Sequence, residues 1–410
     1  MKNIFKNRWW VLFLLFSGTF VTSFDRGSIG AASSTMMKDL GLNAKDMGYV
    51  LSAFGWGYLA FMIPSGVMAD RFGAKKTLGY AAIVWSFFSA ITGSVSSLLQ
   101  LIFCRTGVGL GESAVNPVNT KIVKSHFDSH MRGIAVGLYL SGFRLGLAAA
   151  PVVMVFLIQS YSWRDAFYMT GGASLLWVVL WKLTYHEAEK EVLVSAPARI
   201  PWMKLIRYRS MIGLVLCKFF QDYTYYFFVT WLPLYLIQDR HFSLKESGWS
   251  SSFPFLLAAV CQPLAGIGSD WLAKNGFSLT VARKTPVIVL QLLATIVVIA
   301  GYADSAVLAV WLLSLSLSFE SGASAVLAAT CAEIAPENGA ASASAMMNGA
   351  GALAACICPL ITGYTVNGTG HFEIALWLGA MMLVLGALSM WLIVGKIEPI
   401  RMDDAESSAA

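Results

Sequence analysis

Apolar residues recur in runs of about 20 or more along almost the whole chain of 410 residues, and short polar stretches separate these runs. A hydrocarbon core of roughly 30 Å needs about 20 residues of α-helix, so each run is long enough to cross a bilayer. We therefore predict an all-α polytopic membrane protein with twelve transmembrane helices. The predicted spans are roughly 9–34, 46–69, 77–96, 97–123, 131–158, 165–184, 210–238, 246–270, 283–303, 305–331, 339–366 and 372–395.

Composition and charge agree with this interpretation. Hydrophobic residues make up 57% of the chain and charged residues 13%, which argues against a soluble domain of this length. If the N-terminus is cytoplasmic, the cytoplasmic segments hold 20 Lys and Arg, the outer loops 5, and the spans the remaining 4 of 29. This asymmetry follows the positive-inside rule and predicts that both termini are cytoplasmic. The net charge of +6 therefore does not indicate nucleic-acid binding.

The first apolar run could instead be a signal peptide, because Lys2, Lys6 and Arg8 precede it. Asp25 and Arg26 interrupt the run, which a signal peptide would not tolerate, so we expect a retained first helix. All six cysteines fall within predicted spans, which does not indicate a disulfide framework. We predict no metal site and no cofactor.

A short polar motif occurs twice, about 200 residues apart. It follows the second and the eighth span, a proline precedes each copy, and we expect both copies to lie in loops. This repeat predicts two six-helix halves, residues 1–184 and 210–395, joined by a cytoplasmic linker, 185–209, and followed by a cytoplasmic tail, 396–410. The chain resembles the major facilitator superfamily over its whole length, and that resemblance implies its fold. The motif residues are Gly66, Asp70, Arg71 and Gly73 in the first copy, and Gly266 and Asp270 in the second.

Charged residues inside the spans mark the predicted site, because a charge at the bilayer centre is costly and usually functional. The resemblance implies that spans 1, 4, 7 and 10 line a central cavity, near the midplane between the halves. Seven of the eight intramembrane charges fall on those spans. They are Asp25, Arg26, Arg105, Glu112, Lys218, Asp222 and Glu320, whereas Arg144 lies in span 5.

Arg26 and Arg105 are candidates for holding an anion, because guanidinium matches a carboxylate with two hydrogen bonds. Asp25 and Glu112 are candidates for carrying a coupling proton. The alternative is that Arg105 and Glu112 each pair with another helix and only hold the bundle together. Gly107, Gly109 and Gly111 leave room for a neighbouring helix or a ligand to approach this face.

Several motifs resemble the anion:cation symporter family, with the greatest likeness to bacterial galactonate-type permeases. They include Phe24-Asp25-Arg26, Arg105-x-x-x-Gly109-x-x-Glu112-x-x-x-x-Pro117, and Thr230-Trp231-Leu-Pro233. The resemblance implies proton symport of an organic anion, such as a sugar acid, across the bacterial inner membrane. It also implies Tyr58 and Asn348 as substrate contacts beside Arg26, with Arg105 organising Glu112. A monomer is expected.

The chain departs from the galactonate-type pattern around the predicted cavity. Phe143 and Arg144 follow Ser141-Gly142 where those permeases have a Gln, and Lys218, Asp222 and Glu320 replace uncharged or small residues. The extra cations could bind a second acidic group, or Lys218 could pair with Asp222 and Arg144 with Glu320. Uptake of an aromatic acid, a dicarboxylate or phosphate therefore stays open. A proton-coupled exporter, a sensor and a membrane enzyme are less favoured, because cavity arginines disfavour cationic cargo and no nucleophile-plus-base signature is present.

Overall fold

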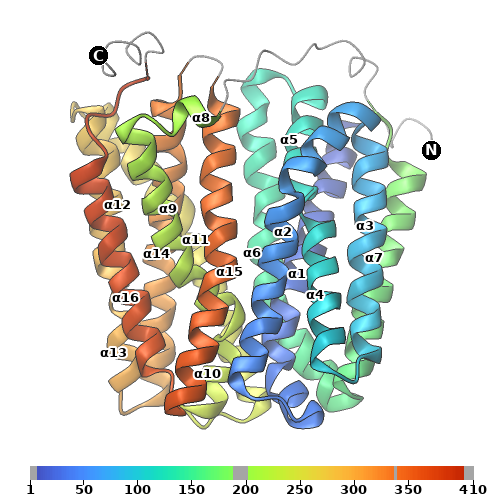
Figure 1. Cartoon of the computed structure of the whole chain (residues 1–410). Helices are drawn as coiled ribbons and strands as arrows, with labels where there is room; N and C mark the ends of the chain where they lie inside the picture. The colour runs from blue at the N-terminus through green and yellow to red at the C-terminus, as the bar shows by residue number, and fades with distance from the viewer. Residues whose placement is uncertain (1–6, 188–201, 337–338, 401–410) are drawn as a thin grey trace. The chain divides into compact units, whose positions relative to one another are not determined.

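The computed structural model describes residues 7–187, 202–336 and 339–400, and each element of regular secondary structure in them is helical (Figure 1). The linker residues 188–201, the tail residues 401–410, and Lys2 and Lys6 lie outside the described part. The helices are α1 (Arg8–Leu40), α2 (Ala44–Phe72), α3 (Ala74–Ile91), η1 (Thr92–Ser94), α4 (Leu98–Glu112), α5 (Val115–His126), α6 (Ser129–Ser160), α7 (Trp163–Thr184), α8 (Trp202–Leu205), α9 (Arg209–Thr230), α10 (Leu232–Gln238), α11 (Leu244–Lys274), α12 (Leu279–Ala294), α13 (Val297–Tyr302), α14 (Ala306–Ile334), α15 (Ala340–Thr369), α16 (Glu373–Leu388) and η3 (Ser389–Ile393).

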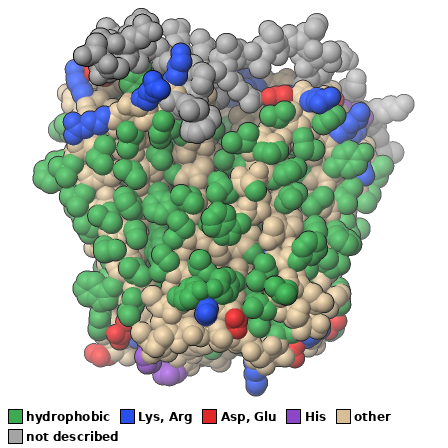
Figure 2. Space-filling model, viewed as in Figure 1, with side chains coloured by type: hydrophobic (Ala, Val, Ile, Leu, Met, Phe, Trp, Pro, Cys, Tyr) green, Lys and Arg blue, Asp and Glu red, His purple; other side chains and the backbone are tan. Residues whose placement is uncertain are grey.

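Each predicted span coincides with one long helix or with consecutive helices separated by a short break. Eight of the described helical stretches are long and apolar enough to cross a membrane by length and composition. The other predicted spans fall on α1, α3, α4–α5 and α9–α10. Of these, α1, α4 and α9 carry buried charges, and α4 has only 15 residues. Figure 2 shows hydrophobic side chains over the middle of the helices and charged side chains near the helix ends.

Polar residues between the apolar runs cap the helices. Asn43 Oδ1 accepts the Asp46 N–H at 2.9 Å, and Asp46 Oδ2 accepts the Asn43 N–H at 3.2 Å, so the two form a capping box at the start of α2. Ser162 Oγ likewise accepts the Asp165 N–H at 3.1 Å where α7 begins. These bonds satisfy backbone donors that the first helical turn leaves without an intrahelical partner.

The break between α4 and α5 follows from Pro117. Proline has no N–H for the carbonyl of Ser113, four residues earlier, and its ring crowds that carbonyl. Ser65 Oγ donates to the Ser113 carbonyl oxygen at 3.3 Å and so replaces part of the missing bond. The break lies directly after Glu112, which is thus the last residue of α4.

The repeated motif lies mostly on helices, and the prediction that it forms loops was wrong. Helix α2 continues through Gly66, Asp70 and Arg71, and α11 continues through Gly266 and Asp270, because nothing in either stretch breaks a helix. The chain turns only at Gly73, whose φ is 85°, a region that glycine adopts easily. In the second copy, Arg283 donates to Asp270 Oδ1 at 2.7 Å and to Glu333 Oε1 at 3.2 Å. In the first, Lys121 Nζ donates to the Ala69 carbonyl at 2.7 Å near the end of α2.

Contacts divide the chain into two compact units. Unit 1 contains Met1–Val194, Val229–Phe253 and Ala355–His371, and unit 2 contains Ser195–Phe228, Pro254–Ala354 and Phe372–Ala410. In unit 1, aromatic rings stack along α7 and its C-cap residue Tyr185. The ring centres of Trp177 and Trp181 are 5.5 Å apart, and those of Trp181 and Tyr185 are 4.1 Å apart. The buried core of unit 2 includes Leu214, Val326 and Leu327. Each unit thus has a hydrophobic core of its own.

Within unit 1, α2 and α15 pack closely at Gly55, which has no side chain. A Cβ at Gly55 would lie 2.7 Å from the backbone nitrogen of Cys356, which is too close for a side chain. Ser52 Oγ donates to the Cys356 carbonyl at 2.5 Å, and the hydroxyls of Tyr49 and Tyr364 form a hydrogen bond. Small residues therefore bring these two helices into direct contact.

Candidate functional site

The centre of the candidate site is an ion pair between α1 and α4. Arg26 donates through Nε and Nη2 to Glu112 Oε2, at 3.2 and 2.8 Å. The side chain of Glu112 is fully buried and that of Arg26 is 12% exposed. A buried ion pair is costly to form unless further contacts hold it, and removing one partner leaves an uncompensated charge. Glu112 therefore depends on the hydrogen bonds from Arg26 to stay ionised in this buried position.

Three aromatic rings surround the Arg26 guanidinium. Its central carbon lies 4.7 Å from the Phe54 ring centre, 5.4 Å from Tyr58 and 5.5 Å from Phe143. Aromatic faces attract a cation, so the rings favour Arg26 in this place without supplying an anion. Asn116 Nδ2 donates to the Tyr58 hydroxyl at 3.1 Å and holds that ring in turn.

Arg105 is a second cation near the Phe54 ring. Its guanidinium lies 5.3 Å from the same Phe54 ring, whereas Arg26 makes the hydrogen bonds to Glu112. Arg105 thus interacts with Glu112 through charge, not through a direct bond of the kind Arg26 makes. Among the described residues, Arg105 Nε and Glu112 Oε1 are buried without a hydrogen-bond partner, so both retain capacity for one more bond.

Asp25 points away from Arg26, although the two are neighbours in sequence. Successive residues on a helix point about 100° apart, and Asp25 turns toward α7, where Ser174 Oγ donates to its Oδ2 at 3.3 Å. Only 2% of Asp25 is exposed. Glu112 thus lies against Arg26, and Asp25 lies inside the helix bundle of unit 1 beside Ser174.

Glycines place these side chains by letting α2 and α4 cross closely. A Cβ at Gly109 would lie 2.1 Å from the Phe54 carbonyl oxygen, and one at Gly57 would lie 2.2 Å from that of Thr106. The glycine-rich face of α4 is thus filled by the backbone of a neighbouring helix. The sequence analysis did not identify Phe54 and Ser174 as parts of the site.

In unit 2, Lys218 and Asp222 pair with each other on α9. Lys218 Nζ donates to Asp222 Oδ1 at 2.7 Å and to Ser324 Oγ at 3.4 Å. Asp222 lies against bare backbone, since a Cβ at Gly351 would meet its Oδ2 at 2.2 Å. The self-pairing that the i,i+4 spacing allows is therefore present.

The other predicted residues are more dispersed. Glu320 is 1% exposed, and Gln221 Nε2 donates to its Oε1 at 3.0 Å. The Arg144 guanidinium lies 5.9 Å from the Phe143 ring in unit 1, and Asn348 is an exposed residue of α15 in unit 2. Their contact with a substrate stays a prediction. Within the described residues, no group of three or more His, Cys, Asp or Glu is placed to hold a metal ion.

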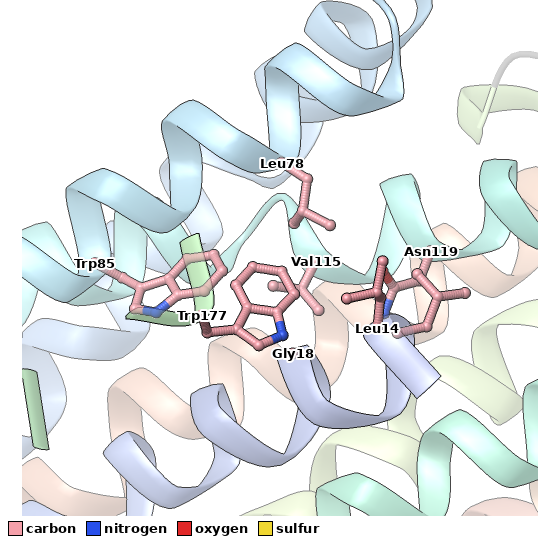
Figure 3. A pocket seen from close by; sticks show the side chains of 8 residues that line it. Leu14, Gly18, Leu78, Trp85, Val115, Asn119 and Trp177 are labelled. Carbon is pink, nitrogen blue, oxygen red and sulfur yellow. The ribbon is translucent and has the colours of Figure 1, made fainter. Parts of the chain in front are cut away.

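Figure 3 shows a narrow crevice within unit 1, and neither Arg26 nor Glu112 is among its lining residues. Trp177 fills part of it and donates through Nε1 to Ser17 Oγ at 3.0 Å. Its walls are mainly apolar, which suits helix packing and not an anion. The lining residues are Leu14, Leu15, Gly18, Leu78, Trp85, Val115, Asn119 and Trp177.

Comparisons with known proteins match nearly the whole chain. A model described as Major Facilitator Superfamily matches residues 15–313. The chain is 32% identical to a probable galactarate/D-glucarate transporter of Bacillus subtilis (strain 168), over 97% of this chain and 94% of that protein. It is 31% identical to a D-galactonate transporter of Escherichia coli O6:H1, over 96% and 97%. A crystal structure of a bacterial homologue of the human lysosomal transporter Spinster superposes with a TM-score of 0.82 at 16% identity, over 95% of this chain and 97% of that one, which supports the fold.

Proposed function

Because the chain belongs to the Major Facilitator Superfamily, a family of membrane transporters and not of enzymes, we propose that it is a proton-coupled symporter that imports an organic anion. A sugar acid or related hydroxy-carboxylate is the proposed cargo. Two similar proteins are named for galactarate/D-glucarate and D-galactonate, which supports this class. The positive-inside asymmetry supports cytoplasmic termini, and the similarity to bacterial transporters supports the bacterial inner membrane as the proposed location.

The observation that carries the proposal is the buried pair of Arg26 and Glu112. A substrate carboxylate competes with Glu112 for the same guanidinium, since both offer two oxygens to its planar fork. When the substrate takes Arg26, Glu112 loses its hydrogen-bonded cation in a low-dielectric site, and a proton neutralises it. Anion and proton are thereby bound together, and alternating access releases both on the other side.

Ligand binding tests the cargo class directly. A ligand that binds the folded protein raises its melting temperature. The melting temperature of the purified protein is therefore measured at about pH 5.5 and about pH 7.5 with each candidate ligand. The panel contains aldonates, aldarates, uronates, aromatic acids, small dicarboxylates, phosphate and cationic drugs. We expect stabilisation by one group of hydroxy-acids, stronger at the lower pH. Stabilisation by cationic drugs alone would contradict anion import and favour the exporter.

Glu112→Gln tests the proton step. The variant keeps a neutral side chain of similar size and no longer binds a proton, so proton-driven accumulation is expected to be lost while binding and exchange remain. Uptake into proteoliposomes under an imposed pH gradient, compared with counterflow without a gradient, separates the two. Glu398→Gln is the control, because the Glu398 side chain is 64% exposed and far along the chain from α4. Gradient-driven accumulation that persists in Glu112→Gln would exclude Glu112 as the proton carrier.

A further inference from the structure

Two buried serine hydroxyls lie near the carboxyl group of Asp25 within unit 1, whereas its Oδ1 has no hydrogen-bond partner among the described residues. Ser174 on α7 is 2% exposed, and its Oγ lies 3.3 Å from Asp25 Oδ2. Ser89 on α3, which is 3% exposed, is a second hydroxyl facing this carboxyl. Two different helices therefore present hydroxyl groups to one buried acid.

The Ser174 hydroxyl has two acceptors within reach. Besides Asp25 Oδ2, its Oγ lies 3.1 Å from the carbonyl oxygen of Thr170, one turn earlier on α7. A serine carries a single O–H proton and two lone pairs, so it cannot donate fully to both acceptors at once. It can donate to the Thr170 carbonyl and accept from Asp25 only when Asp25 carries a proton.

We propose that Ser174 is a positioning residue that provides a hydrogen-bond partner for Asp25 Oδ2 in both protonation states of the carboxyl group. When Asp25 is ionised, the Ser174 O–H donates to Oδ2. When a proton arrives on Oδ2, that proton is donated to Ser174 Oγ, and the Ser174 O–H turns to the Thr170 carbonyl. The serine proton rotates but never leaves its oxygen, so Asp25 gains and loses one proton and all other atoms keep theirs.

The charged groups around Asp25 explain why a neutral partner such as Ser174 matters. Arg105 and Glu112 of α4 interact with Asp25 through charge, with opposite signs, and α3 and α7 present serines. Arg26, the next residue of α1, bonds to Glu112 instead. Among the described residues, the hydrogen bond to Asp25 comes from a neutral hydroxyl and not from an arginine, and Arg105 stabilises its ionised form only through charge. The inference rests on the proposed function only in taking Asp25 as a group that binds the coupling proton.

Infrared spectroscopy of the purified protein tests the proposal without any substrate. Difference spectra between about pH 5 and about pH 9 report the carbonyl band of a protonated carboxyl group, and Asp25→Asn identifies which band belongs to Asp25. In Ser174→Ala both forms of Asp25 lose a hydrogen bond, but the ionised form loses the stronger, charge-assisted one, so we expect the titration midpoint of this band to rise by about one pH unit. The band should also move to higher frequency, because the carboxyl O–H loses its acceptor.

Matched variants separate this role from a structural one. Ser174→Thr keeps a hydroxyl and should restore the midpoint and the band. Ser252→Ala removes another buried serine, whose Oγ donates only along its own helix to the Gly248 carbonyl at 3.0 Å, and should leave the band unchanged. An unaltered midpoint in Ser174→Ala, or an Asp25 band that does not titrate in the wild type, would overturn the proposal. If the band behaves as expected but proteoliposomes show no proton coupling, the proposed function fails while the role of Ser174 stands.

Discussion

Arg26→Ala is expected to weaken binding of the transported anion by roughly 100-fold or more, and to abolish uptake, because truncating one member of a buried charge pair typically costs about 2–5 kcal/mol. The substrate loses its cation, and the three aromatic rings around Arg26 offer no replacement. Arg26→Lys keeps the charge but not the planar fork that now reaches Glu112 through Nε and Nη2. We expect it to bind more weakly than the wild type as well.

Isothermal titration with the anion found in the thermal screen measures the effect. Arg8→Ala is the control, since the Arg8 side chain is 44% exposed and lies 3.7 Å from Asp128. An exposed pair of this kind contributes little, so the control should bind normally. Wild-type affinity in Arg26→Ala would remove Arg26 from the anion site.

A double variant distinguishes lost binding from lost folding. Arg26→Ala leaves Glu112 as a buried charge without its partner, which destabilises the protein. Adding Glu112→Gln removes that charge, so Arg26→Ala with Glu112→Gln should melt at a higher temperature than Arg26→Ala alone. Such non-additivity is expected only for residues that interact directly. Additive effects would show that the two side chains do not form the pair.

Bilayer thickness explains how much of the fold was predictable. Each span must be a helix of sufficient length, and the apolar runs therefore located the helices well. Their breaks and ends were harder to predict, because they depend on local bonds. The break beside Glu112 follows from Pro117 together with Ser65 of another helix, and the repeated motif stays helical because no residue before Gly73 stops it.

The site, like the fold, could be predicted from the sequence only in part. A charge inside an apolar run is visible in the sequence, so Arg26, Arg105 and Glu112 could be identified from it. Which of them pair depends on how α1 rotates against α4 and α7. That rotation turns Arg26 to Glu112 and Asp25 to Ser174, and no local pattern encodes it. Phe54 was harder to identify still, because its role comes from lying under Arg26 and Arg105 at once.

Gly109→Ala is expected to disrupt the packing of α2 against α4 strongly. The added Cβ would lie 2.1 Å from the Phe54 carbonyl oxygen and 3.0 Å from the Tyr58 nitrogen, both of them backbone atoms that cannot rotate away. Helices α2 and α4 must separate to accept it, and overpacking of this kind typically costs about 1–3 kcal/mol or more. We therefore expect a clear fall in the melting temperature.

Gly137→Ala is the matched control, because no atom beyond the local backbone of α6 lies within 4 Å of a Cβ built at Gly137. Alanine is about 1 kcal/mol better than glycine inside a helix, so this control should be neutral or slightly stabilising. The comparison removes helix propensity as an explanation, since both changes improve it by the same amount. A Gly109→Ala protein as stable as Gly137→Ala would mean that the two helices do not cross as closely as described.

The same variant also connects packing with function. Phe54 and Tyr58 belong to the segment of α2 that Gly109 contacts, and both rings lie against Arg26. A shift of α2 moves these rings away from the guanidinium even if the protein stays folded. Anion affinity in Gly109→Ala should therefore fall at temperatures well below its melting point, whereas Gly137→Ala should bind as the wild type does. A destabilised protein with normal affinity would show that the crossing supports the fold without setting the position of Arg26.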